Sequence, residues 1–120
     1  MKRDIRIGIK SDDDFFAEAR EIARKVDAGW SPEQPVERIY FDDLPTLLKH
    51  LTAKRFELLN ALHAMGHVSI NALAKRLHRQ YRNVFDDVKT LERLGLIEKD
   101  EANRFFVPWN EIDATFRLAA

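Results

Sequence analysis

The sequence predicts an α+β fold from three patterns. Residues 3–10 alternate between polar and apolar side chains, with three isoleucines on one face, as in a half-buried strand. Apolar residues then recur at helical spacing in several segments up to Gly95. Two short β-type runs joined by a polar turn follow that glycine. The expected order is therefore a strand, several helices and a hairpin.

Size and composition restrict what else the chain contains. Its 120 residues, 45% of them hydrophobic, suffice for one compact domain with a core and a small appendage. No apolar run has membrane-spanning length and no hydrophobic signal segment follows the first residues, so we expect a cytoplasmic protein. Cysteine is absent, which excludes disulfides, thiolate metal sites and cysteine nucleophiles.

A helix, a second strand and a short helix are predicted after the first strand. Ser11 is a candidate N-cap, and the three aspartates that follow lie where a helix dipole favours negative charge. A loop with two prolines comes next, and residues 36–41 then have the composition of a strand. Asp42 is expected to cap a short helix that runs through Leu51.

Three further helices are predicted between residues 52 and 94. Thr52 and Ser69 are candidate N-caps, because a hydroxyl can accept a hydrogen bond from a first-turn amide. Gly66 and Gly95 are expected to end helices, since glycine adopts positive φ readily. A polar break at residues 78–80 separates the last two helices. The expected core positions are Phe56, Leu59, Leu62, Met65, Ile70, Leu73, Ala74, Leu77, Val84, Val88, Leu91 and Leu94.

The C-terminal quarter is predicted to be β-structure. Residues 96–99 and 104–108 flank a polar turn and are typical of a hairpin. Residues 112–118 alternate, which favours a terminal strand able to pair with the first one. Two short helices joined by about three residues match a helix-turn-helix, and a hairpin after the helices makes it a winged helix-turn-helix.

The winged helix-turn-helix, with its terminal strand, is assigned to residues 49–120, and the strand-helix-strand extension to residues 1–48. Helix-turn-helix proteins commonly bind DNA as two-fold dimers, so we expect the extension to pair two copies in a homodimer. The apolar side chains expected at that surface are Phe15, Phe16, Trp30, Tyr40 and Phe41.

The distribution of charge favours a nucleic-acid partner although the net charge is zero. Residues 49–82 contain seven lysines or arginines against one glutamate, a net charge of +6. Each flank has a net charge of −3: eight basic and eleven acidic residues in 1–48, and five and eight in 83–120. The positive charge is thus concentrated where the helix-turn-helix begins, which fits phosphate contact.

These motifs resemble the winged-helix transcriptional regulators of the MarR-like type. They are more closely similar to a group of small bacterial and archaeal DNA-binding proteins often labelled transcriptional regulators or antitoxins. The residues of the resemblance are Leu51, Thr52, Arg55, Ser69, Ile70, Leu73, Ala74, Leu77, Arg79, Asn83, Val84, Leu91, Gly95 and Leu96. The resemblance implies binding to double-stranded DNA and, for the antitoxin form, binding to a toxin protein.

The candidate DNA-binding residues follow from helical geometry. With Val84, Val88 and Leu91 facing the core, the opposite side of their helix is expected to enter the major groove. Glutamine or asparagine suits adenine, and arginine suits guanine or phosphate. The candidates are Ser69, Arg79, Gln80, Tyr81, Arg82, Asn83, Asp87 and Lys89 on the helices, and Lys99 and Arg104 on the wing.

Asp86 and Asp87 depart from the pattern of the resembling family. Carboxylates repel DNA phosphates unless they are paired, here with Arg82 or Lys89. Alternatively, one of them accepts a hydrogen bond from cytosine.

The expected function is that of a sequence-specific regulator of transcription that binds double-stranded DNA and controls its own gene. The competing interpretation is a protein-interaction module or antitoxin that binds a toxin through residues 1–48; the neutral net charge and the Asp86-Asp87 pair favour it. No catalytic triad order, phosphate-binding glycine loop or nucleotide signature occurs, so neither an enzyme nor a cofactor is expected. His63 and His67 lack a further ligand, and no metal site is expected.

Overall fold

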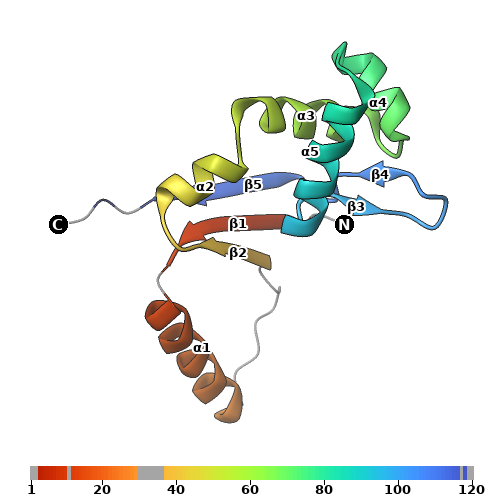
Figure 1. Ribbon diagram of the computed structural model, residues 1–120. Helices are drawn as coiled ribbons and strands as arrows, with labels where there is room; N and C mark the ends of the chain where they lie inside the picture. Colours follow the sequence, from red (N-terminus) through yellow and green to blue (C-terminus); the bar gives the residue numbers. More distant parts are fainter. Residues whose placement is uncertain (1–2, 11, 30–36, 117, 119–120) are drawn as a thin grey trace. The chain divides into compact units, whose positions relative to one another are not determined.

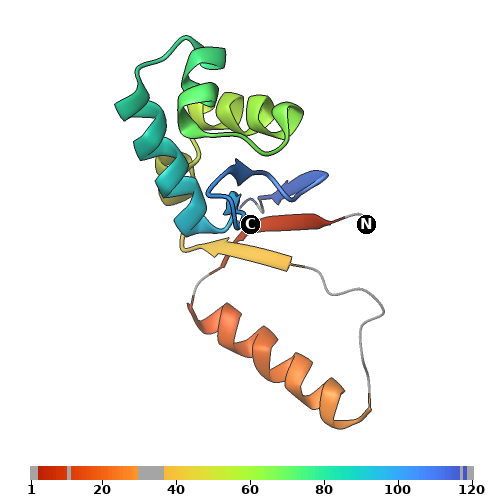
Figure 2. The same ribbon diagram turned by 90° about the vertical axis from the view of Figure 1, so that its right-hand side faces the viewer.

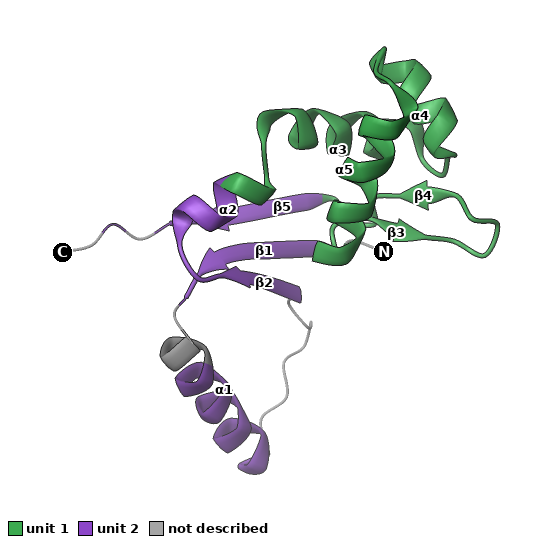
Figure 3. Cartoon of the chain, viewed as in Figure 1, with its two compact units in different colours: residues 1–3, 49–110 green, residues 4–48, 111–120 purple. Residues whose placement is uncertain are grey.

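The α+β class is confirmed by a computed structural model that describes residues 3–10, 12–29, 37–116 and 118. The described chain forms five helices, a three-stranded parallel sheet and a two-stranded antiparallel hairpin (Figure 1). It divides into two compact units, unit 1 with residues 1–3 and 49–110, and unit 2 with residues 4–48 and 111–120 (Figure 3). The predicted cap Ser11, Trp30 and its loop, and the Phe15 side chain lie outside the described parts.

Unit 2 contains the parallel sheet, in the order β2-β1-β5. Strand β1 (Asp4–Ile9) pairs with β2 (Glu37–Phe41) on one side and with β5 (Glu111–Thr115) on the other (Figure 2). The predicted pairing of the terminal strand with the first strand is therefore confirmed. Because of this pairing, residues 111–120 belong to the same compact unit as residues 4–48. They were predicted to belong to the domain of residues 49–120.

Alternation gives this sheet one apolar and one polar face. Ile5 and Ile7 of β1 are almost fully buried. The intervening residues Arg6 and Gly8 lie beside Arg38 and Tyr40 of β2 in the strand register, so these four share the other face. Helix α1 (Asp12–Asp27) connects β1 to β2, and of its described side chains only Glu18 is partly buried.

Helix α2 (Leu44–His50) begins one residue later than predicted. The Asp43 carboxylate accepts a hydrogen bond from the Thr46 amide at 2.8 Å. The Thr46 side chain, and then this amide, lower the pKa of Asp43. The predicted cap Asp42 is wrong because the amide three residues beyond it would belong to Pro45, and proline has no N–H. The helix also ends before Leu51, which is buried.

Unit 1 contains helices α3 (Ala53–Met65), α4 (Ile70–Leu77) and α5 (Tyr81–Leu94). Their predicted starts are confirmed: Thr52 accepts a hydrogen bond from the Arg55 amide, and Ser69 accepts one from the Ala72 amide. Gly95 ends α5 with φ 89°, as predicted. Residues 78–80 connect α4 to α5, and His78 adopts the left-handed conformation there, with φ 53°.

The hairpin of unit 1 is shorter than the sequence suggested. Only β3 (Glu98–Lys99) and β4 (Phe105–Phe106) form a ladder. Asp100 organises the turn, because its carboxylate accepts hydrogen bonds from the amides of Ala102 and Arg104 at 2.9 and 3.0 Å. Phe105 also pairs with Val68, which ties the hairpin to the segment before α4.

Fourteen buried side chains among the described residues of unit 1 form its core, and most of the predicted positions are among them. The exceptions are Phe56, which is 38% exposed, and Met65, Leu77 and Leu94, which are half-buried, while Leu58 is fully buried without having been predicted. The core residues are Leu51, Leu58, Leu59, Leu62, Ile70, Leu73, Ala74, Val84, Val88, Leu91, Leu96, Ile97, Phe105 and Trp109.

Candidate nucleic-acid interface

The start of α5 presents four consecutive exposed side chains: Gln80, Tyr81, Arg82 and Asn83. Val84, the next residue, is fully buried and anchors this turn to the core. Gln80 is the N-cap residue, yet its side chain makes no capping hydrogen bond. The first-turn amides of α5 are therefore not covered by a side-chain cap, and such amides attract anions.

Tyr81 and Arg82 are held near this surface by Phe85. The Tyr81 ring stacks against Phe85 with 6.1 Å between centroids, and the Arg82 guanidinium lies 5.8 Å from the same ring. Arg82 also forms an ion pair with Asp86 at 3.6 Å, one turn along the helix. Both partners are more than half exposed, so the pair restrains Arg82 only weakly.

Asp87 joins three segments of unit 1. One of its carboxylate oxygens accepts a hydrogen bond from Arg55 Nε at 3.1 Å, and the other accepts one from an Arg79 Nη atom at 2.7 Å. Arg55 also donates to the carbonyl oxygen of His50 at 2.6 Å. Only 14% of the Asp87 side chain is exposed, so this cluster ties the start of α3 and the turn before α5 to α5 itself.

This cluster engages two of the residues predicted to contact DNA, Arg79 and Asp87, in bonds within unit 1. Arg79 and Asp87 point toward each other, and about a fifth or less of each side chain is exposed. For Asp86 and Asp87 the predicted pairing partners were Arg82 or Lys89, and Arg55 was missed. A helical wheel cannot find that partner, because Arg55 lies 32 residues away on another helix.

The remaining predicted residues occupy different surroundings. Ser69 is exposed, with its hydroxyl acting as the α4 cap. Lys89 pairs with Glu92 at 2.9 Å, and its Nζ lies 5.8 Å from the Phe105 ring. Lys99 Nζ lies 5.9 Å from the centre of the same ring, and Arg104 is exposed at the hairpin turn.

Lysines and arginines outside the predicted set add to this surface. Lys75 and Arg76 on α4 and Lys54 on α3 are exposed and form no ion pair with any described residue. The sequence showed them only as part of the basic segment, because helical spacing does not reveal which cations are neutralised by distant residues. Their charge is available to an external anion.

The geometry of unit 1 combines exposed polar groups on a well-packed helix with unpaired cations nearby in the sequence. A family model with the description HVO_A0114 matches residues 50–114, more than half of the chain, including α3, α4, α5 and the hairpin. Comparison with curated proteins and with solved structures finds no match. Within the described ranges, no helix has the length and apolar character needed to cross a bilayer.

Proposed function

The chain belongs to the HVO_A0114 family, and we propose that it is a sequence-specific DNA-binding regulator of transcription, not an enzyme. In this proposal unit 1 is a winged helix-turn-helix. The sequence of α3, α4, a three-residue turn, α5 and the β3-β4 hairpin supports it. The observation that carries the function is the exposed start of α5, where four polar or aromatic side chains precede a buried valine.

In the proposed complex α5 lies in the major groove. Gln80 and Asn83 have the amide groups that pair with adenine, and Arg82 can reach guanine or a phosphate. The uncapped amides of α5 suit a phosphate oxygen. Lys75 and Arg76, with Lys99 and Arg104 on the wing, supply further phosphate contacts. Arg79 acts by holding Asp87 and the turn in place.

The test is binding of the full chain to its own upstream DNA across a salt series. Gln80→Ala combined with Asn83→Ala removes base-reading groups without changing charge. We expect this double variant to lose discrimination between operator and random DNA, by about tenfold or more, while the salt dependence stays unchanged. Arg82→Ala should weaken binding to both DNAs and reduce the salt slope by roughly one.

The matched control is Arg20→Ala, which removes the same charge from an exposed position on α1 in unit 2. It should leave DNA affinity nearly unchanged. If the wild-type chain is folded but binds neither DNA at low salt, the proposal is wrong.

A homodimer formed through unit 2 is part of the proposal. Apart from Phe56 and Tyr81, every large hydrophobic side chain that is exposed among the described residues belongs to unit 2. Three of them, Phe16, Ile22 and Val26, come from α1 and range from 43% to 58% exposed. Apolar surface of this kind marks an interaction site, and pairing unit 2 would present two copies of α5 to a two-fold operator.

The same apolar surface supports the second candidate function, capture of a toxin protein by unit 2. Under that alternative DNA binding is secondary. A purified chain that stays monomeric, and whose α1 variants still bind DNA normally, would favour the partner protein over the homodimer.

A further inference from the structure

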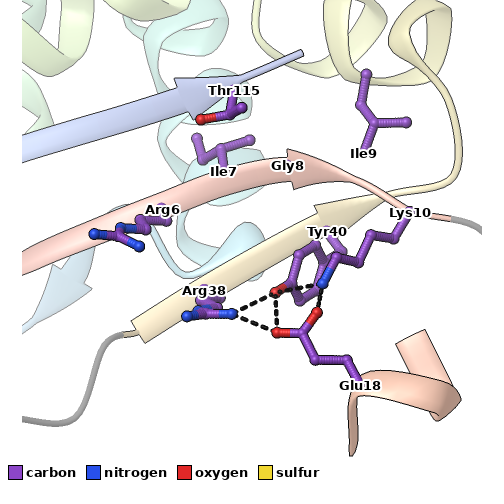
Figure 4. Close-up of a pocket in the computed structure, with 9 residues that line it drawn as sticks. All are labelled: Arg6, Ile7, Gly8, Ile9, Lys10, Glu18, Arg38, Tyr40 and Thr115. Carbon is purple, nitrogen blue, oxygen red and sulfur yellow. Dashed lines mark hydrogen bonds and ion pairs between the residues drawn. The ribbon is translucent and has the colours of Figure 1, made fainter. Parts of the chain in front are cut away.

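Unit 2 has a hollow of about 580 Å³ on the polar face of its sheet (Figure 4). Arg6, Lys10, Arg38 and Tyr40 come from β1 and β2 and the residues at their ends, and Glu18 comes from α1. The Ile7 and Ile9 side chains point to the other face of the strand (Figure 4). Gly8 adds no side chain to the floor, which leaves the space open. The volume lies in the range of small-molecule sites.

The lining of the hollow is positively charged. It has three cations, Arg6, Lys10 and Arg38, against the single carboxylate of Glu18. Arg6 and Arg38 are direct partners in the strand register, an arrangement that costs stability because like charges repel across a sheet. Arg6 is exposed and forms no ion pair with any residue that the structure describes. On its other side Arg6 has Asp113 of β5 as its register partner, but Asp113 does not line the hollow, so cations outnumber carboxylates in the lining by three to one.

Tyr40 lies inside this positive field. Its hydroxyl accepts hydrogen bonds from Arg38 Nη1 at 3.2 Å and from Lys10 Nζ at 3.4 Å. Lys10 Nζ also lies 4.6 Å from the centre of the Tyr40 ring. Partial burial raises the pKa of Tyr40, but Arg38 and Lys10 together lower it more, so the pKa lies below the usual 10.0.

Glu18 shows where an oxyanion fits. Its carboxylate contacts both Lys10 and Arg38 and lies 3.5 Å from the Tyr40 hydroxyl (Figure 4). One carboxylate thus occupies the point on which two cations and a hydroxyl converge. An external anion at the same point would have the same partners and, in addition, Arg6 nearby in the lining.

We propose that this hollow binds a small organic anion through a phosphate or carboxylate group that takes the place of the Glu18 carboxylate between Lys10 and Arg38. The inference goes beyond the proposed DNA binding and does not depend on it, because all of these residues belong to unit 2. Phosphate and carboxylate share the chemistry that the site recognises, and the choice of probe separates them.

The test is calorimetric titration of the full chain, without DNA, with inorganic phosphate, methyl phosphate and malonate. We expect saturable binding with one site per chain, and the better probe identifies the anionic group. Arg38→Gln should weaken that binding about tenfold, because a charge-assisted contact is lost. Glu18→Gln should tighten it about tenfold, since the competing carboxylate is removed.

The matched control is Glu21→Gln, which removes one charge from the same helix. Glu21 pairs with Arg24 on α1 and does not line the hollow, so anion affinity should not change. Circular dichroism establishes that each variant is folded. The proposal is overturned if neither the wild type nor Glu18→Gln binds any probe saturably, or if Glu18→Gln binds no more tightly than Glu21→Gln.

Discussion

Two neighbouring aspartates on α5 have opposite surroundings. Asp87 is 14% exposed and accepts hydrogen bonds from Arg55 and Arg79, whereas Asp86 is 56% exposed and has one ion pair with Arg82. We expect Asp87→Ala to lower the free energy of unfolding by roughly 2–3 kcal/mol, because two largely buried guanidinium groups lose their acceptor. Urea unfolding followed by circular dichroism measures this change.

Asp86→Ala is the control for that measurement. An exposed ion pair of this kind contributes about 0.3–0.5 kcal/mol, so this variant should unfold at nearly the wild-type urea concentration. If Asp87 instead reads a base, Asp87→Ala will keep its stability and change only the preference for DNA sequence. That result would contradict the structural role of the cluster.

At the scale of elements, the features that were predicted correctly are those that depend on neighbouring residues along the chain. The Thr52 and Ser69 caps and the Gly95 helix end are set by bonds that reach only three or four residues, and all three are confirmed. The pairing of β5 with β1 was predicted because both segments alternate, whereas its parallel direction was not predicted. Caps and alternation are visible in a sequence because the interactions that make them are local or periodic.

Contacts between segments that are distant in the sequence could not be predicted from local or periodic patterns. The burial of Leu58 in place of Phe56 depends on how α3 packs, and periodicity alone allowed either. The Arg55 partner of Asp87 and the convergence of Lys10 and Arg38 on Glu18 each join residues from separate elements. The exposed turn at Gln80 was predicted correctly because it depends only on the position of Val84 in the core.

The β3-β4 hairpin should lose stability in acid through Asp100. The amide of Arg104 and then the ring of His67 stabilise the ionised carboxylate and hold its pKa below the usual 3.8. Since the folded pKa is lower than the unfolded one, the stabilisation is complete above the unfolded pKa and is lost as pH falls through the folded value. Asp100→Asn removes this dependence, so its stability deficit relative to wild type should shrink in acid.

Thermal unfolding of both proteins between about pH 5 and pH 2, where carboxyl groups titrate, provides the comparison. The same deficit at both ends of that range would show that ionisation of Asp100 does not stabilise the turn. Glu101→Gln in the adjacent position is a suitable control, because Glu101 is exposed and forms no ion pair with a described residue.

At the scale of the whole molecule, the zero net charge hides a difference between the units in their exposed side chains. Unit 1 contains the exposed lysines and arginines of α3 and α4, whereas unit 2 contains most of the exposed apolar side chains. A dimer formed through unit 2 would therefore leave the basic surface of unit 1 for DNA. Two linked binding modules gain affinity without any new contact, because the second one binds at high effective concentration.

The proposed dimer predicts different effects for two lysine substitutions on α1. Ile22 and Val26 are four residues apart and lie on the same side of α1, and Ala17 lies on the opposite side of the helix. We expect Ile22→Lys to produce a mass of one 14.0 kDa chain in sedimentation equilibrium and to weaken operator binding at least tenfold. Ala17→Lys adds the same charge at an exposed site and should remain dimeric. A wild-type chain that sediments as a monomer at micromolar concentration, or an Ile22→Lys dimer that binds the operator normally, would rule out α1 as the dimer interface.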